Sequence, residues 1–189
     1  PHRAIIRLVR GPDYLPWGPD QRFLLFASTA FDASTLELWG ALLHGGTCVV
    51  SRAGATDLDA LARLIRTERV TFALFTTGLF NRIIDTDPGL IRPLPNLLTG
   101  GEAMSVRHAR RALETLPGTR LINGYGPTES ATLVCTRHVR LDDCPPTAAA
   151  VPIGSPIANT DCLLLDSVGQ PVPDGLPGAL LVGGDGLAT

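Results

Sequence analysis

The 189-residue sequence contains no lysine, because all 16 residues of its Lys+Arg total are arginine. A catalytic lysine and a lysine-bearing phosphate loop are therefore excluded within these residues. The apolar runs are strand-length or shorter, well below the roughly 18 consecutive apolar residues that indicate a membrane helix. No secretory signal peptide opens the chain. We expect a soluble, cytoplasmic protein with no membrane partner.

Metal-binding and nucleic-acid-binding patterns are also missing. The four cysteines and four histidines stand apart, without the paired Cys-x-x-Cys spacing of a zinc site. We expect the cysteines to be small, buried, apolar side chains in a reducing compartment. The net charge is -2 and the arginines are scattered, which disfavours a nucleic-acid partner.

What is present predicts an α/β fold. The hydrophobic content of 44% is enough for a core. From Phe23 to Asn123, short apolar runs alternate with amphipathic segments, which favours β-α units around a mainly parallel sheet flanked by helices. Ser34 and Glu37 have the spacing of a capping box, and Asp57 and Ser105 are expected to cap later helices. The expected strands are 23–27, 47–50, 70–75, 96–99 and 120–122.

The pattern changes after Thr132. Strands are expected at 133–139 and 162–166, and seven prolines break the remaining sequence into turns. We therefore predict an α/β lobe at 1–140 and a β-rich segment at 141–189 that is incomplete at its C-terminal end.

Three polar segments follow expected strands or precede expected helices. The run Asn123 to Glu129 combines an aromatic ring, a Gly-Pro turn, a hydroxyl and a carboxylate, which suits a nucleotide, its phosphates and a metal ion. Gly100-Gly101-Glu102 offers backbone amides at the carboxyl end of a strand, where parallel sheets bind ligands. Asp32, between an apolar strand and a helix, can pair with an amine.

Each segment also has a purely structural interpretation. The two glycines form a turn, Tyr125 is a half-buried core residue, Glu129 favours a helix start, and Asp32 is a helix cap. These alternatives account less well for the whole run, because burying Asn, Tyr, Thr and Glu together would leave several polar groups in need of partners.

The segments resemble, in order, the core motifs of amino-acid-activating adenylation domains of nonribosomal peptide synthetases, which belong to the adenylate-forming enzymes. The resemblance spans nearly the whole chain. It implies the flavodoxin-like lobe of such an enzyme and a central piece of its large N-terminal subdomain. The matching segments are Pro1 to Arg3, Phe31 to Ser34, Leu98 to Glu102, Asn123 to Glu129 and Gly183 to Ala188.

By this resemblance, ATP and Mg²⁺ are the cofactors. Tyr125 stacks on adenine, and Asn123, Gly126 and the backbone of Gly100, Gly101 and Glu102 fix the nucleotide. Thr128 contacts the α-phosphate and Glu129 the magnesium ion, so these two residues are the predicted catalytic pair. The family reaction forms an aminoacyl adenylate and pyrophosphate, and then loads the aminoacyl group onto a carrier-domain thiol.

The resemblance also implies the amino-acid pocket, with Asp32 holding the substrate's α-amino group. Apart from Asp32 the implied lining is uncharged, which favours a small or medium aliphatic amino acid of the valine type. Leu36 and Leu74 are equally consistent with ordinary core residues. The implied lining is Asp32, Ala33, Leu36, Leu74, Leu98, Gly100, Gly124, Thr132 and Leu133.

Several family motifs are not among these residues. The lysine-bearing phosphate loop, the ribose-binding aspartate and the small domain with its catalytic lysine are expected outside the chain. We therefore interpret it as a fragment of an antibiotic-type synthetase that is flanked by peptidyl carrier and condensation domains in the parent, and expect little activity from the fragment alone.

Two other functions remain open. One is a non-catalytic module that binds an amino acid or a nucleotide, and the other is a ligase that activates a carboxylate other than an amino acid. Asp32 distinguishes the latter, because only an amino-acid substrate needs a carboxylate partner for its amine.

Overall fold

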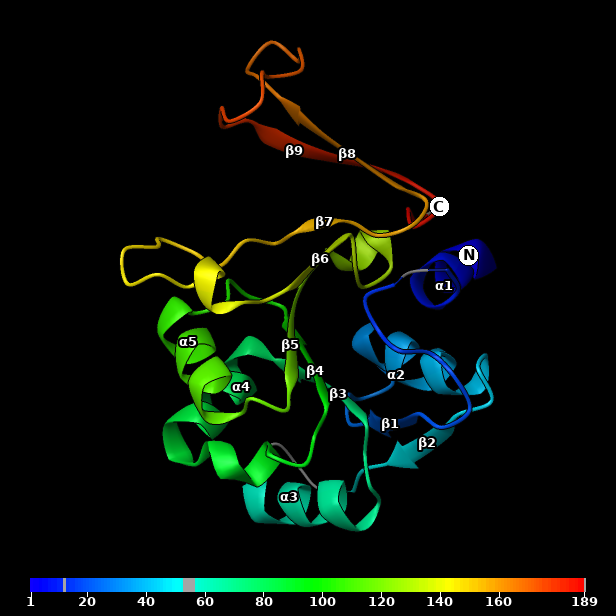
Figure 1. The fold of residues 1–189 in the computed structure, drawn as a ribbon. Helices are drawn as coiled ribbons and strands as arrows, with labels where there is room; N and C mark the ends of the chain where they lie inside the picture. Colours follow the sequence, from blue (N-terminus) through cyan, green and yellow to red (C-terminus); the bar gives the residue numbers. More distant parts are fainter. Residues whose placement is uncertain (12, 53–56, 189) are drawn as a thin grey trace.

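The computed structural model describes residues 1–11, 13–52 and 57–188, and its centre is a sheet in the order β2-β1-β3-β4-β5-β6-β7 (Figure 1). The first five strands in this order are parallel, and β6 and β7 are antiparallel to their neighbours. The parallel order 2-1-3-4-5 is that of flavodoxin-like sheets. The strands are β1 (Arg22–Leu25), β2 (Thr47–Val50), β3 (Phe72–Thr76), β4 (Asn96–Gly100), β5 (Arg120–Tyr125), β6 (Cys135–His138) and β7 (Ser155–Pro156).

Helices cover both faces of this sheet (Figure 1). Helices α1 (His2–Val9) and α2 (Ala33–Leu42) pack on one face, and α3 (Leu58–Thr67), α4 (Thr77–Thr86) and α5 (Val106–Thr115) pack on the other. Short 3₁₀ turns lie at η1 (Pro88–Ile91), η2 (Thr128–Ser130) and η3 (Leu141–Asp143). The predicted mainly parallel sheet flanked by helices is confirmed.

Successive strand residues enter two separate cores. Leu97 and Leu121 belong to the core under α3, α4 and α5, whereas Leu98 and Ile122 belong to the core under α1 and α2. A strand that is buried on both faces has no polar alternation, which explains the short continuous apolar runs of the sequence. The sheet therefore anchors both helical layers.

Local signals placed several elements correctly. Strand β2 has the predicted bounds, and the Asp57 side chain accepts a hydrogen bond from the Ala60 amide at the start of α3. Helix α5 begins after Ser105, but the Ser105 side chain makes no capping hydrogen bond; it lies 2.7 Å from Nδ1 of His108.

The predicted capping box of Ser34 and Glu37 is wrong. The N-cap of α2 is Asp32, and the Ser34 hydroxyl donates to the carbonyl of Phe31. Glu37 points away from the helix start and accepts hydrogen bonds from the amides of Phe26 and Ala27. The amides at the end of β1 thus win the carboxylate from the amides of the helix.

A second, two-stranded sheet follows the main one. Strands β8 (Thr160–Leu165) and β9 (Ala179–Gly184) pair antiparallel and project from the lobe (Figure 1). Leu163, Leu164 and Leu181 on this hairpin are exposed. The β-rich C-terminal portion is confirmed. The domain boundary near residue 140 stays a prediction, since β7 pairs with β6 of the main sheet.

The cysteines are free thiols. Cys135 and Cys144 are buried, and Cys48 and Cys162 are half-buried. The Sγ atoms of Cys135 and Cys162 lie 3.9 Å apart, and burial together with this neighbour raises the pKa of Cys135 to about 12. Among the described residues, no helix is both long enough and apolar enough to cross a membrane.

Candidate functional site

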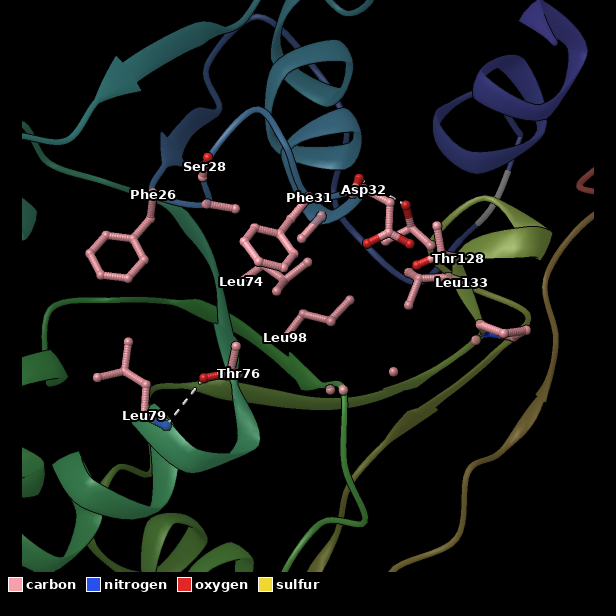
Figure 2. A pocket seen from close by; sticks show the side chains of 18 residues that line it. Phe26, Ser28, Phe31, Asp32, Leu74, Thr76, Leu79, Leu98, Thr128 and Leu133 are labelled. Carbon is pink, nitrogen blue, oxygen red and sulfur yellow. Dashed lines mark hydrogen bonds between the residues drawn. The ribbon is translucent and has the colours of Figure 1, made fainter. Parts of the chain in front are cut away.

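A cavity of about 580 Å³ opens where β1, β3, β4 and β5 end (Figure 2). This is the edge of a parallel sheet where ligands bind, next to the point where the strand order reverses between β1 and β3. Its size is within the range of ligand pockets. The lining residues are Phe26, Ala27, Ser28, Phe31, Asp32, Ala33, Leu74, Thr76, Leu79, Leu98, Gly100, Gly101, Gly124, Gly126, Pro127, Thr128, Thr132 and Leu133.

The chemistry of this cavity is apolar with one charge. Asp32 is the only ionisable residue in its lining, and Leu74, Leu98 and Leu133 form much of the wall (Figure 2). Asp32 is at the N-cap position of α2, yet its side chain makes no capping hydrogen bond. Its carboxylate is therefore free to bind a cation at the mouth of the cavity.

Two glycines make the wall thin. Gly100 on β4 and Gly124 on β5 are register partners, and a Cβ on Gly100 would lie 2.6 Å from the carbonyl oxygen of Gly124. A Cβ on Gly124 would lie 2.8 Å from Cδ2 of both Leu98 and Leu133. Side chains at these two positions would thus enter the cavity or the neighbouring strand.

A second cavity of about 380 Å³ lies on the other side of the same wall. It shares Gly101, Gly124, Gly126 and Pro127 with the first cavity. Tyr125 lines it with a side chain that is 39% exposed, leaving an aromatic face open to a ligand. The remaining lining residues are Glu102, Ala103, Met104, Asn123, Ala150, Val151 and Ile153.

Buried polar side chains hold the loops of this second cavity. The Asn123 amide nitrogen donates to the carbonyl of Pro152, at 2.9 Å. The Thr77 hydroxyl contacts the carbonyls of Gly100 and Glu102, at 3.2 and 3.0 Å. These contacts fix the Gly-Gly-Glu loop and the start of the 150–153 segment against each other.

A third, open cavity of about 440 Å³ carries the acidic end of the site. Thr128 lines both this cavity and the first one, and Glu129 lines the third alone. One exposed carboxylate suits Mg²⁺, which is typically held by one or two carboxylates together with substrate phosphates. Within the described ranges, no group of three or more His, Cys, Asp or Glu residues could hold a metal by itself.

The turn after Glu129 has an unusual backbone. Ala131 and Thr132 both have positive φ angles, of 49° and 73°. This is rare for residues other than glycine, and for a β-branched residue it indicates a conformation that the surroundings impose. The Thr132 hydroxyl donates to the carbonyl of Asp32 at 3.0 Å, which ties this turn to the start of α2.

Glu37 supports the cavity wall from behind. Its Oε2 accepts from the amides of Phe26 and Ala27, each at 3.0 Å, and both residues line the first cavity. The other oxygen, Oε1, is buried without a partner among the described residues. Burial raises the pKa of Glu37 to about 7, partly offset by the two backbone hydrogen bonds.

The structure brings most of the predicted residues together. All predicted pocket residues except Leu36 line the first cavity, and the predicted nucleotide residues line the second and third cavities or their shared wall. Leu36 is fully buried in the core beneath α1 and α2 and is not in the cavity lining. The roles of these residues stay predictions.

Sequence reasoning missed the deep end of the cavity. Phe26 and Leu79 lie there, and the Thr76 hydroxyl accepts from the Leu79 amide as the cap of α4 (Figure 2). Their signal was present, because Phe26 and Thr76 stand at the carboxyl ends of neighbouring parallel strands. Thr76 is the register partner of Gly100.

A separate polar chain lies outside these cavities. The His108 ring joins the Ser105 hydroxyl at 2.7 Å to the Asp85 carboxylate at 3.0 Å. None of the three residues lines a cavity described above. We interpret this chain as a structural link between α4 and α5.

Comparison with known proteins identifies the same family over the whole length. The family model described as "AMP-binding enzyme" matches residues 1–189. The chain is 41% identical to part of the linear gramicidin synthase of Brevibacillus parabrevis over 188 residues, which are 100% of the chain and 2% of that protein. It is 42% identical to malpibaldin synthetase of Mortierella alpina over 191 residues, covering 100% and 3%. The chain thus spans a small part of these curated relatives.

Solved structures give the same result. PA1221, described as an NRPS protein containing adenylation and PCP domains, superposes in its inhibitor-bound holo form with a TM-score of 0.94 and 43% identity, covering 98% of the chain and 32% of PA1221. The N-terminal subdomain of Klebsiella oxytoca NpsA in complex with 3-hydroxybenzoyl-AMSN has a TM-score of 0.88 and 27% identity, covering 98% and 46%.

The raised pKa of Glu37 generates a stability prediction. The folded state holds this proton more tightly than the unfolded chain, whose ordinary value is 4.5, so stability falls as the pH rises from about 4.5 to about 7. Glu37→Gln keeps an oxygen for the two amides and cannot ionise. Relative to the unsubstituted chain, its free energy of unfolding in urea should rise by about 2 to 3 kcal/mol between pH 5 and pH 8.

Glu114→Gln, on the exposed surface of α5, is the matched control for this measurement. An equal effect of Glu37→Gln at pH 5 and pH 8 would show that the carboxyl group does not titrate in this range.

Proposed function

The chain belongs to the AMP-binding enzyme family, and from this membership we propose that it selects an amino acid and holds the adenine ring in an ATP-dependent adenylation domain. Its similarity to nonribosomal peptide synthetase adenylation domains agrees with the family predicted from the motifs. The activity proposed is that of the parent protein.

One observation carries the proposal. A free carboxylate, Asp32, lies at the mouth of an apolar cavity that shares a glycine wall with a second, tyrosine-lined cavity. An amino acid presents an amine, an apolar side chain and a carboxylate in close succession. With its amine at Asp32 and its side chain among the leucines, its carboxylate is directed toward the shared wall and Thr128.

The second cavity suits adenine. Tyr125 offers a ring face for stacking, and the backbone of Gly100, Gly101 and Glu102 together with Asn123 surrounds the edge of a flat base. Gly126 keeps the passage between the cavities open, because a Cβ there would lie 2.6 Å from the carbonyl oxygen of Thr132. The α-phosphate of ATP is then expected near Thr128, where the first and third cavities meet.

The reaction follows from this arrangement. The amino-acid carboxylate attacks the α-phosphate of ATP, forming an aminoacyl adenylate and releasing pyrophosphate. Thr128 binds the α-phosphate and Glu129 is the carboxylate that holds Mg²⁺, which, when bound, neutralises charge on the phosphates. The protein's main contribution is to hold carboxylate and phosphorus in line.

The proposed substrate is a small or medium aliphatic amino acid, with valine favoured. The uncharged lining of Ala33, Leu74, Leu98 and Leu133 supports this class, since it offers no partner to a charged side chain. In the parent protein the aminoacyl group would pass to a carrier-domain thiol. An adjacent peptidyl carrier domain, with a condensation domain beside it, is supported by the adenylation and PCP domains of PA1221.

Asp32→Asn tests the amine-binding role. In the parent protein the substitution should lower kcat/KM for valine by about 10- to 100-fold, because it removes the charge that faces the ammonium group. The rate with 3-methylbutanoate, which is valine without its amine, should not fall. Both are measured by exchange of pyrophosphate into ATP.

Asp59→Asn, on α3 and outside all described cavities, is the control for this loss of charge. Unchanged activation of valine by Asp32→Asn would favour a ligase for carboxylates other than amino acids.

Gly124→Ala tests the pocket itself. Its methyl group would push Leu98 and Leu133 into the cavity, and the kcat/KM ratio of valine to alanine should fall by about tenfold. Gly118→Ala is the matched control, since nothing lies within 4 Å of a Cβ at Gly118. The role of Gly124 would be refuted by a ratio that stays constant.

The isolated 189-residue chain should show no amino-acid-dependent pyrophosphate exchange above the blank. It contains no lysine, so it supplies no ammonium group to the phosphates. Clear exchange by the isolated chain would contradict this expectation. Tight binding of one amino acid by the parent protein, measured by calorimetry and without adenylate formation, would instead favour a binding module.

A further inference from the structure

Arg7 on α1 is one of the most deeply buried charged residues of the protein. Its side chain is 1% exposed, and burial lowers its pKa. Nη1 donates to the Thr160 hydroxyl at 2.6 Å, and Nη2 donates to the carbonyls of Ser130 and Ala131 at 2.7 and 3.2 Å. One guanidinium group therefore contacts the turn after Glu129 and the start of β8 at the same time.

The glycine motif at Gly183 to Ala188 packs against this guanidinium. A Cβ on Gly186 would lie 2.6 Å from Cζ and Nη2 of Arg7, so only a glycine leaves the arginine in place. The next contact of the motif reaches the site directly, because the Ala188 amide donates to the carbonyl of Glu129 at 2.7 Å. The carboxylate of Asp185 is close enough to raise the pKa of Arg7.

These contacts surround the strained turn of the site. Ala131 and Thr132 have positive φ angles, which the surrounding contacts must maintain. Thr132 is held by its hydroxyl on the Asp32 side, and Ser130 and Ala131 are held by Arg7 on the other side. Thr128 and Glu129 lie on the segment that leads into this turn.

We propose that Arg7 is a positioning residue that, seated on Gly186, fixes the turn carrying Thr128 and Glu129 and links its geometry to the β8–β9 hairpin. The glycine motif thereby gains a role that its sequence alone did not indicate. The effect on catalysis rests on the function proposed above, whereas the structural link does not depend on it.

Two alanine substitutions in the same motif form a matched pair. In Gly186→Ala the new methyl group meets the far end of the Arg7 side chain, so the guanidinium must move while the backbone stays free of the clash. In Gly183→Ala the methyl group meets only Asp161 atoms at 3.6 Å or more, which is ordinary contact. Arg7→Lys is the third variant, because it keeps the charge but loses the planar fork of donors.

The first experiment uses pyrophosphate exchange by the full parent protein with valine, or with the fastest of the twenty standard amino acids. Gly186→Ala and Arg7→Lys should lower kcat/KM for ATP at least tenfold and raise the MgCl₂ concentration needed for half-maximal rate, because Thr128 and Glu129 are displaced. The KM for the amino acid should stay within about twofold. Gly183→Ala should behave as the unsubstituted protein does.

This separation distinguishes positioning from general destabilisation. A partly unfolded enzyme would lose kcat while every KM stayed the same. The positioning role is rejected if Gly186→Ala matches Gly183→Ala, or if the KM for the amino acid changes as much as the constants for ATP and MgCl₂. Should Arg7→Lys fail to fold, the glycine pair alone decides.

A second experiment does not depend on activity. Amide hydrogen exchange of the 127–133 segment should be at least tenfold faster in Gly186→Ala and Arg7→Lys, and unchanged in Gly183→Ala. If no amino acid supports exchange in the unsubstituted protein, the proposed function fails while this measurement still tests the link. Equal protection of the segment in all four proteins would overturn the inference.

Discussion

The parallel register of β3, β4 and β5 is the constraint on which the site depends. It aligns Thr76, Gly100 and Gly124, so that three strands end at one edge and release their loops together. Both faces of these strands are buried, which leaves no freedom to slide one strand past another without exposing apolar side chains. The cavities on either side of Gly100 and Gly124 inherit their spacing from this register.

How much of this was accessible from the sequence differs between elements. Strand β2 and the Asp57 cap depend on a few adjacent residues, and both were predicted correctly. Helix α1 was not expected, because its buried face includes Arg7 and so lacks the pattern of an amphipathic helix. Glu37 matched a local capping rule, yet the amides at the end of β1 offered it a partner that only the folded chain brings near.

The candidate site shows the same division. Polar residues that follow strands could be grouped from sequence, since parallel strands end at one edge. Phe26 and Leu79 were missed because apolar residues at strand ends look identical whether they line a cavity or fill a core. The opposite happened with Leu36, which is fully buried and faces no cavity.

The glycine wall also divides the pocket into a permanent part and an exchangeable part. At Gly100 and Gly126 any side chain would collide with backbone atoms of another segment, so these positions cannot vary without moving strands. Leu74, Leu98 and Leu133 contribute only side-chain atoms to the lining, on a backbone that the sheet already fixes. A lineage that acquires a new substrate would therefore change the leucines and keep the glycines, altering the shape of the pocket without rebuilding its frame.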